Sequence, residues 1–357
     1  MTQTEFALSM PIGAWHPLLP AALRSIAIQK ARVNLAILDA SGDPRVSEAI
    51  TSSGVSVVYR RDGADQGQAA AIAEGWANVP GAILGWLNAD DILMPDALEI
   101  AARALARPDA PDVVFGDSVI IDAEGAVLGL HGQVGAVDQR IVMANMISQP
   151  SCFVRRSAVE AVGGINPRLA YTMDWELWIR LFRAGMGFHH VDHILSAVFW
   201  GEATKTSELG ARRLSEIGRV SLRYGGPIAA ARTLVGVLTQ AHGDRKWVRD
   251  RVARRRGPPP SAVGIYTAAD GNPGEIPTPV RELRLLNTGD VARSTIRIVT
   301  RGGEARVEID GLASTDAPEE GVRVVQLSRP VEPGEVIAIT LIAQGQSVRL
   351  RRVEWHG

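Results

Sequence analysis

The first half of the chain alternates short apolar segments with segments whose apolar residues recur every three or four positions. The apolar segments are predicted to be strands and cover residues 6–10, 33–38, 55–59, 82–87 and 112–115. The segments with helical spacing cover residues 18–29, 44–53, 68–78 and 95–106. This alternation is typical of β–α–β units. It predicts an α/β domain with a mostly parallel sheet flanked by helices, whose ligand binds at the carboxyl ends of the strands.

The second half of the chain changes to a different pattern. Helices are predicted at residues 157–162 and 174–184, and a long helix follows at 207–256. Gly257 and the three prolines after it end this helix. Segments that alternate apolar with polar residues then predict an antiparallel, jelly-roll-like β-sandwich; they cover residues 281–286, 294–299, 305–309, 322–327, 336–341 and 347–353.

These patterns divide the chain into four parts. The expected parts are an α/β domain at 1–206, a helical, basic extension at 207–256, a proline-rich linker at 257–261 and a β-sandwich at 262–357.

The charges of the chain nearly cancel. Lys and Arg together number 38 and Asp and Glu 39, which gives a net charge of −1 and argues against an electrostatic nucleic-acid binder. Charge is concentrated in residues 244–256, which hold seven Lys or Arg residues against two Asp residues. A solvated helix face is the favoured interpretation of this segment, and peripheral contact with an anionic membrane is the alternative.

Two other features indicate where the protein works. Cys152 is the single cysteine, so the chain forms no internal disulfide and does not depend on an oxidising compartment. The sequence has no run of 18 apolar residues and no positively charged leader. We therefore expect a protein of the cytoplasm or of the inner face of the membrane, without a membrane-spanning helix.

Acidic residues follow three consecutive strands of the predicted sheet. Asp39 follows the second strand, Asp65 lies in the loop after the third, and Asp90 and Asp91 follow the fourth. One such aspartate is often only a turn residue, but three strand ends in succession favour a bound cation. Carboxylates bind Mg²⁺ or Mn²⁺ and leave positions for the phosphate oxygens of a nucleotide. The chain has neither a P-loop nor a dinucleotide fingerprint, which argues against those nucleotide-binding classes.

Several segments carry a more specific signal through their order and spacing. They include Asp39–Asp43, Asp65–Gln68, Leu84–Asp91, Ser148–Phe153 and Tyr171–Arg180. With these segments, over about residues 5–206, the chain resembles the family 2 glycosyltransferases, inverting enzymes with the Rossmann-like GT-A fold. The resemblance implies transfer of a monosaccharide from a nucleotide diphosphate sugar, with UDP as the expected nucleotide, to a hydroxyl acceptor in glycan or polysaccharide biosynthesis. It also implies a Mg²⁺ or Mn²⁺ cofactor and a saccharide or lipid-linked acceptor.

The resemblance gives roles to three aspartates. Asp174 matches the catalytic base, which takes the proton of the acceptor hydroxyl as the diphosphate departs from the opposite side. Its alternative role is only to cap the helix that starts at Trp175. Asp91 matches the metal ligand, and Asp90 is expected to contact the ribose or the water shell of the metal.

Other residues match the donor and acceptor sites of the family. Pro11 and Ile12 are expected to line the nucleotide pocket, and Asp39 to accept a hydrogen bond from the uracil ring. Asp65 is expected to contact the base or the ribose, with Gln68 near it. The matches for the acceptor or the sugar, each with packing, an ion pair or loop hydrogen bonding as its alternative, are Gln149, Ser151, Trp175 and Arg180.

One segment departs from the family pattern. Relatives place a histidine of the metal shell just after the strand corresponding to residues 194–198, but residues 199–206 keep Thr-Lys-Thr without that histidine. Water or Glu202 is expected to fill its place. The departure leaves an alternative function, a weak or inactive transferase-like protein that binds glycan through its β-sandwich. A sugar-phosphate nucleotidyltransferase is disfavoured because no glycine-rich basic loop follows the first strand.

Overall fold

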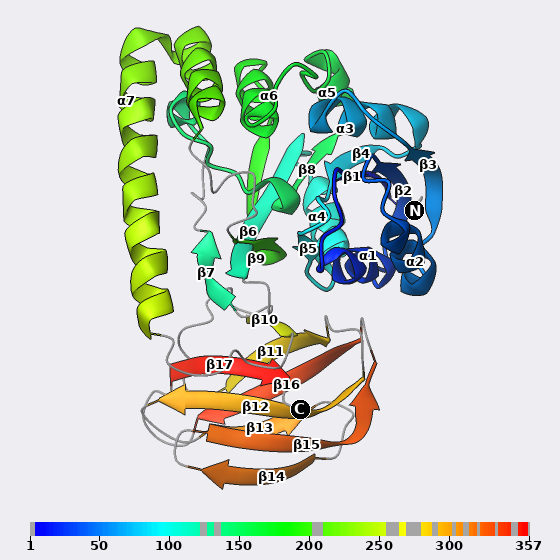
Figure 1. The fold of residues 1–357 in the computed structure, drawn as a ribbon. Helices are drawn as coiled ribbons and strands as arrows, with labels where there is room; N and C mark the ends of the chain where they lie inside the picture. The colour runs from blue at the N-terminus through cyan, green and yellow to red at the C-terminus, as the bar shows by residue number, and fades with distance from the viewer. Residues whose placement is uncertain are drawn as a thin grey trace.

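The computed structural model describes the chain in several ranges. They are residues 4–121, 127–131, 137–201, 210–254, 264–268, 280–287, 292–301, 305–309, 314–319, 322–332, 335–343 and 349–355. Figure 1 shows an α/β part, with a long helix beside it, and a part made of antiparallel sheets at the C-terminal end.

The α/β part is built on one sheet of nine strands. In spatial order the strands are β3 (Val57–Asp62), β2 (Arg32–Asp39), β1 (Glu5–Ile12), β4 (Ile83–Trp86), β8 (Cys152–Arg155), β6 (Val113–Ile121), β9 (Phe188–Phe199) and β5 (Ile92–Leu93), with β7 (Val127–His131) beside β6. Only β5, β7 and β8 run against the other six strands. The predicted α/β fold with a mostly parallel sheet is therefore confirmed.

Helices cover both faces of this sheet. They are α1 (Leu19–Ala27), α2 (Pro44–Ser53), α3 (Gln68–Asn78), α4 (Ala97–Leu105), α5 (Arg156–Ala161) and α6 (Met173–Arg183), with short 3₁₀ helices η1 (Gln139–Val142) and η2 (Gln149–Ser151). Strand β1 shows why both faces need covering: Phe6 and Leu8 pack in the core with α1, α2 and α4, while Ala7 packs in the core with α3, α5 and α6. Successive side chains of a strand point to opposite faces, so a strand buried on both sides is apolar throughout.

The ends of α2 follow directly from the local sequence. The Asp43 carboxylate accepts a hydrogen bond from the Arg45 N–H at 3.0 Å, which caps the first turn. Pro44 occupies the first helical position, where a missing N–H costs nothing. Gly54 follows the last residue with φ of 69°, a left-handed conformation that favours glycine.

The long helix α7 (Ala211–Arg254) belongs to the α/β part at its N-terminal end. Ile217 and Val220 are buried in the same core cluster as α3 and α6. The helix is kinked at Gly226, which has φ of 80°, just before Pro227. Proline has no N–H to continue the helical ladder, which explains a kink where the sequence pattern predicts one continuous helix.

The C-terminal residues form two four-stranded antiparallel sheets. One sheet holds β10 (Gly264–Ala268), β11 (Val280–Asn287), β16 (Val336–Ala343) and β13 (Ala305–Ile309), and the other holds β14 (Ser314–Glu319), β15 (Val322–Val331), β12 (Arg293–Arg301) and β17 (Arg349–Trp355). Their buried residues include Ile296, Ile298 and Val325 from one sheet and Ile337 and Ile339 from the other. The predicted all-β C-terminal part is therefore confirmed.

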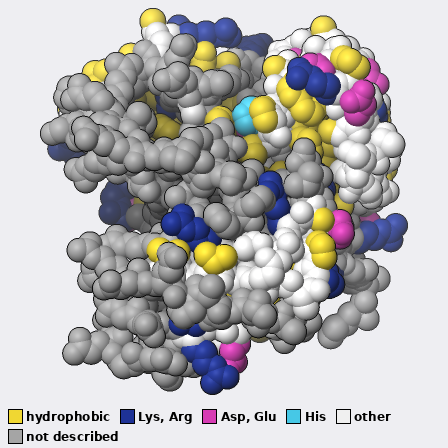
Figure 2. All heavy atoms as spheres, turned by 60° about the horizontal axis from the view of Figure 1, so that its bottom comes forward, with side chains coloured by type: hydrophobic (Ala, Val, Ile, Leu, Met, Phe, Trp, Pro, Cys, Tyr) yellow, Lys and Arg dark blue, Asp and Glu magenta, His cyan; other side chains and the backbone are white. Residues whose placement is uncertain are grey.

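Figure 2 shows the face of the molecule that carries these sheets. On the described atoms of this face, Lys and Arg side chains are spread among acidic, polar and hydrophobic ones and do not gather in one broad patch. This distribution agrees with the balanced charge of the chain.

Candidate functional site

Two neighbouring parallel strands end side by side at the predicted edge. Ile12 of β1 is paired with Asp39 of β2, and the Ala40 N–H donates to the Ile12 carbonyl at 2.8 Å. Pro11 and Ile12 are both buried, so they shape this edge through their backbone and their packing. The structure therefore brings Pro11, Ile12 and Asp39 together.

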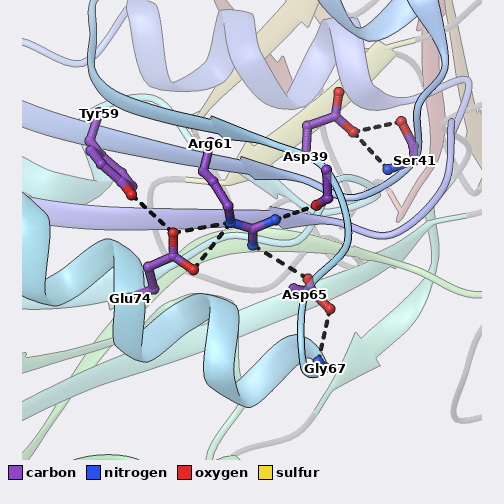
Figure 3. A network of polar contacts seen from close by, with 8 residues as sticks. Asp39, Ser41, Tyr59, Arg61, Asp65, Gly67 and Glu74 are labelled. Carbon is purple, nitrogen blue, oxygen red and sulfur yellow. Dashed lines mark hydrogen bonds and ion pairs between the residues drawn. The ribbon is translucent and has the colours of Figure 1, made fainter.

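Asp39 has one carboxylate oxygen engaged by its own turn. Its Oδ1 accepts hydrogen bonds from the Ser41 N–H at 2.9 Å and the Ser41 hydroxyl at 2.6 Å. Figure 3 shows both bonds ending on the same oxygen while the other oxygen points away from Ser41. Asp39 is only 4% exposed, so the turn holds its carboxylate in a fixed orientation at the end of β2.

Asp65 lies in a polar network that shapes the loop before α3 (Figure 3). The Arg61 guanidinium is 3.0 Å from Glu74 and 3.7 Å from Asp65, and the Tyr59 hydroxyl donates to Glu74 at 3.0 Å. Asp65 Oδ1 also accepts from the Gly67 N–H at 2.8 Å. The contacts of Asp65 in the described part of the chain therefore stabilise the loop that leads to Gln68.

A chain of side-chain amides joins α3 to the acidic pair after β4. Gln68 Nε2 donates to Asn88 Oδ1 at 2.7 Å, and Asn88 Nδ2 donates to Asp91 Oδ2 at 2.9 Å. Asn88 Nδ2 also lies 3.3 Å from Gln149 Oε1, and Gln149 Nε2 donates to the Trp86 carbonyl at 2.7 Å. Asn88 thereby fixes the orientation of Asp91, a role that the sequence reasoning did not assign.

Asp90 and Asp91 bring two adjacent carboxyl groups into a poorly solvated place. Burial and the neighbouring charge of Asp90 raise the pKa of Asp91 well above its ordinary value, although the hydrogen bond from Asn88 opposes this. Burial likewise raises the pKa of Asp90, against the attraction of His16. A buried and a half-buried carboxylate side by side, both with raised pKa values, form an arrangement that a bound cation would stabilise.

The donor atoms fit a hard divalent cation that keeps open positions. Within the described residues, no group of three or more His, Cys, Asp or Glu side chains could enclose a metal ion. The Asp90–Asp91 pair alone offers only carboxylate oxygens, which suit Mg²⁺ or Mn²⁺ that also holds water and phosphate oxygens. Glu202, expected in the place of the missing histidine, lies outside the described residues.

A histidine approaches the acidic pair from the loop after β1. His16 is half-buried, its ring lies 4.7 Å from that of Phe199, and it interacts with Asp90. Its Nδ1 accepts the Leu18 N–H at 3.2 Å, which places the proton of the neutral ring on Nε2. Burial lowers the pKa of His16 more than Asp90 raises it. Sequence reasoning missed this residue because only the fold brings the loop to Asp90.

Asp174 lies in the first turn of α6 and is half-buried. Thr172, and not Asp174, occupies the N-cap position of the helix. Asp174 Oδ2 accepts a hydrogen bond from Asn145 Nδ2 at 2.7 Å. Burial raises the pKa of Asp174, although the Trp175 N–H and Asn145 oppose this. A raised pKa makes the carboxylate a better proton acceptor.

Packing links Asp174 to the acidic pair. The indole of Trp178 on α6 stacks on that of Trp86 on β4, with ring centroids 5.9 Å apart. Cys152 directly follows η2, which carries Gln149, and the charge of Asp174 adds to burial in raising the Cys152 pKa. The segment from Gln149 to Cys152 therefore connects the surroundings of Asp91 and Asp174.

The remaining residues matched to the acceptor have structural contacts. Ser151 is fully buried in a cluster of hydroxyls with Ser118 and Ser196. Trp175 is 3% exposed and its indole N–H donates to the Ile141 carbonyl. Arg180 forms an ion pair with Glu176 at 2.9 Å.

His190 of β9 is held by contacts with the neighbouring strand β6. His190 Nε2 lies 3.0 Å from Asp117 Oδ1, and its ring lies beside Phe115. These contacts join β9 to β6 and agree with a structural role for His190.

Comparison with known proteins adds to this geometry. Residues 16–158 match the sequence model described as glycosyl transferase family 2. An uncharacterized glycosyltransferase of Rickettsia conorii is 24% identical over 194 residues, which are 51% of this chain and 30% of that protein. The chain thus spans less than a third of the length of this curated relative.

Two solved structures similar to this chain were solved in complex with a nucleotide sugar. TarS residues 1–349 of S. aureus, in complex with UDP-GlcNAc, has a TM-score of 0.48 and 13% identity, covering 66% of this chain and 72% of that one. The mannosyltransferase PcManGT of Pyrobaculum calidifontis, in complex with GDP-Man and Mn²⁺, has a TM-score of 0.46 and 14% identity, covering 71% and 80%.

Proposed function

Because this chain carries a glycosyltransferase domain of family 2, we propose that it moves a monosaccharide from a UDP-sugar to a hydroxyl acceptor with inversion at the anomeric carbon. The observation that supports this most is the combination of a candidate cation site for the departing diphosphate with a candidate base for the attacking hydroxyl. The buried Asp91 and the half-buried Asp90 beside it suit a cation on a diphosphate, and Asp174, linked to them through η2 and Trp178, suits a proton acceptor.

We propose that the donor nucleotide lies against the ends of β1 and β2. Asp39 Oδ1 is held by Ser41, so Oδ2 is the oxygen that would accept a uracil N–H. Pro11 and Ile12 would form the wall beside it. Asp65 and Gln68 would act on the donor mainly by shaping the loop before α3 and by orienting Asn88.

We propose that Asp91, with Asp90 beside it, holds a Mg²⁺ or Mn²⁺ ion. Such an ion supplies positive charge to the departing diphosphate. Asn88 would keep Asp91 Oδ2 aimed at it. The Nε2–H of His16, next to Asp90, is placed to donate a hydrogen bond on the same side.

On the acceptor side, Asp174 would remove the proton of the attacking hydroxyl. A single in-line displacement needs one such base and no covalent sugar–enzyme bond. Gln149 would contact the sugar or the acceptor directly, since it lies beside Asn88. The other three residues matched to the acceptor would stabilise the site: Ser151 and Trp175 by packing, and Arg180 by its ion pair.

The acceptor and its location are part of the proposal. We propose a saccharide or lipid-linked acceptor in glycan or polysaccharide biosynthesis, with the two C-terminal sheets as a candidate glycan-binding part. No helix in the described part of the chain has the length and apolar character to cross a membrane. The side chains of residues 244–256, for which a membrane contact is the alternative, lie outside the described part, so that contact stays a prediction.

A binding measurement and an activity measurement test this function. We expect UDP to bind by calorimetry only with Mn²⁺ or Mg²⁺ present, and Asp91→Ala to abolish this binding. We expect Asp174→Asn to lower transfer by about 100-fold to 10,000-fold, as loss of a general base does, while UDP binding is unchanged. Asp109→Asn, which removes an exposed aspartate paired with Arg107, is the control. Normal turnover by Asp174→Asn, or metal-independent UDP binding, would contradict the proposal.

A further inference from the structure

A buried glutamate of α7 accepts several hydrogen bonds from the segment that leads into α6. Glu216 is 8% exposed. Its Oε1 accepts the N–H groups of Tyr171 and Thr172, both at 2.7 Å, and the Thr172 hydroxyl at 2.9 Å. Its Oε2 accepts the Ala170 N–H at 3.0 Å. One carboxylate therefore satisfies three consecutive backbone donors.

These bonds end immediately before Asp174. Thr172 is the N-cap of α6, and its own side chain makes no capping hydrogen bond to the helix. The first N–H groups of a helix and its positive dipole end favour a negative charge nearby, which Glu216 supplies from another element. Burial raises the pKa of Glu216, but the bonds from residues 170–172 together bring it below its ordinary value, so the carboxylate is charged.

Helix α7 also contacts the segment that carries Asn145, the residue that donates a hydrogen bond to Asp174. Ser221 and Thr233, on the two sides of the Gly226 kink, are hydrogen bonded to each other at 2.9 Å. Ser221 donates to the Val142 carbonyl at 3.0 Å and Thr233 to the Met143 carbonyl at 2.9 Å. Asn145, which donates to Asp174, follows two residues later.

We propose that Glu216 is a positioning residue for Asp174, and that the N-terminal half of α7 is the scaffold that sets the base relative to the acceptor. The proposal rests on the proposed function of Asp174. It gives the start of the helical, basic extension a role at the proposed site, whereas the sequence pattern predicts only a helix there. Among the described charged or titratable groups, Glu216 and Arg213 on α7 and Cys152 on β8 interact with Asp174, and Tyr171 in the loop interacts with Arg213.

Hydrogen exchange tests the hydrogen bonds from residues 170–172 to Glu216 directly and does not require an active enzyme. In the full-length chain, Glu216→Ala should make the amides of residues 170–172 exchange faster, because their acceptor is lost. Glu216→Gln should keep most of the protection, since one amide oxygen can still accept the bonds that now end on Oε1. Glu160→Gln, an exposed glutamate on α5, is the matched control. Unchanged exchange in Glu216→Ala would overturn the proposal.

Kinetics test the effect on the base. We expect Glu216→Ala to lower kcat by about 100-fold, as a misplacement of about 1 Å does, with the donor KM within about twofold of wild type because the donor site lies on other elements. The charge of Glu216 raises the pKa of Asp174. Glu216→Gln should therefore move the acidic limb of the kcat–pH profile to lower pH while keeping most of kcat.

The outcomes separate this proposal from the proposed function. An inactive wild type that binds no UDP-sugar contradicts the proposed function, and the exchange measurement still decides whether Glu216 holds residues 170–172. An active wild type with a normal kcat in Glu216→Ala overturns the positioning role. Equal losses of kcat and of UDP binding in Glu216→Ala would also overturn it, since they indicate a general loss of structure.

Discussion

At the scale of single residues, Asn88 shows how an uncharged side chain can fix the orientation of a charged one. It accepts from Gln68 and donates to Asp91, so its amide has one orientation and its N–H₂ group faces the carboxylate. A carboxylate left without this donor would be free to rotate and would lose an interaction that favours its charged form. Residues of this kind therefore contribute to cation binding through the ligand that they orient.

We predict that Asn88→Ala weakens the Mn²⁺-dependent binding of UDP by about 10-fold to 100-fold, the usual effect of losing a partner of a metal ligand. Calorimetry with UDP at a series of Mn²⁺ concentrations measures this. Asn78→Ala is the control, because Asn78 is exposed and its side chain donates to the Glu74 carbonyl within α3. Wild-type affinity in Asn88→Ala would show that Asp91 needs no orienting amide.

A second prediction concerns the pH dependence of Asp174. Its hydrogen bond from Asn145 favours the charged carboxylate and lowers its pKa, while burial raises it. Removing the donor in Asn145→Ala should raise this pKa further. Because the base must be deprotonated to act, the acidic limb of the kcat–pH profile should move to higher pH, opposite to the shift expected for Glu216→Gln. A shift to lower pH in Asn145→Ala would contradict this account.

The sequence points to the aspartates of the proposed site but not to the groups that hold them. Asp91 and Asp174 stand out because strand ends and helix starts can be located from local patterns. Asn88, His16 and Glu216 each have a partner 20 or more residues away, which is Gln68, Asp90 and Thr172 respectively, so only the folded chain reveals them. Trp175 could equally stack on a sugar or pack in a core until its burial is known.

At the scale of elements, strong periodicity predicts more than short runs do. Helices α2 and α3 have the predicted bounds because Asp43 with Pro44 and the glycines at 54 and 67 mark their ends. Strand β5 has two residues and β8 has four, and both pair mainly through backbone contacts with strands distant in sequence. Such elements carry too few side chains to show a period.

Helix α3 offers a prediction about packing. A Cβ at Gly75 would lie 2.3 Å from Ser9 Oγ and 3.0 Å from Leu38 Cδ2, so α3 approaches β1 and β2 as closely as only glycine permits. We predict that Gly75→Ala lowers the free energy of unfolding by about 1–3 kcal/mol, measured by urea denaturation. It should also weaken UDP binding, because a displaced α3 moves Gln68 away from Asn88.

The control for Gly75→Ala is Gly218→Ala on α7. A Cβ there would meet Leu234 at 3.5 Å, an ordinary contact, and alanine favours a helix by up to about 1 kcal/mol over glycine. Gly218→Ala should therefore match or exceed the stability of wild type. Equal stability of the two variants would show that the close approach of α3 is relieved by a small shift of the helix.

At the scale of the whole molecule, the α/β part and the C-terminal sheets have separate hydrophobic interiors. The large clusters of the α/β part contain residues of the sheet, its helices and α7, whereas Ile298, Val325 and Ile339 are buried within the C-terminal strands. The change from helical to alternating pattern predicts this division. The pattern does not show on which side α7 belongs, because a helix face reveals that it is apolar but not what it packs against.

We propose that the functional unit of the α/β part ends within α7 and not at residue 206. A chain ending at residue 254 keeps Ile217 and Val220 in the core and Glu216 on residues 170–172. A chain ending at residue 210 loses these contacts, together with those of Ser221 and Thr233.

We predict that the chain ending at residue 254 unfolds cooperatively near the temperature of the α/β part in the full chain, as followed by circular dichroism, and that it binds UDP with Mn²⁺. The chain ending at residue 210 should aggregate or melt without a sharp transition. If the shorter chain folded and bound UDP equally well, α7 would be an attachment to a complete domain, and its hydrogen bonds to the segments around Asp174 would serve neither its stability nor its nucleotide site.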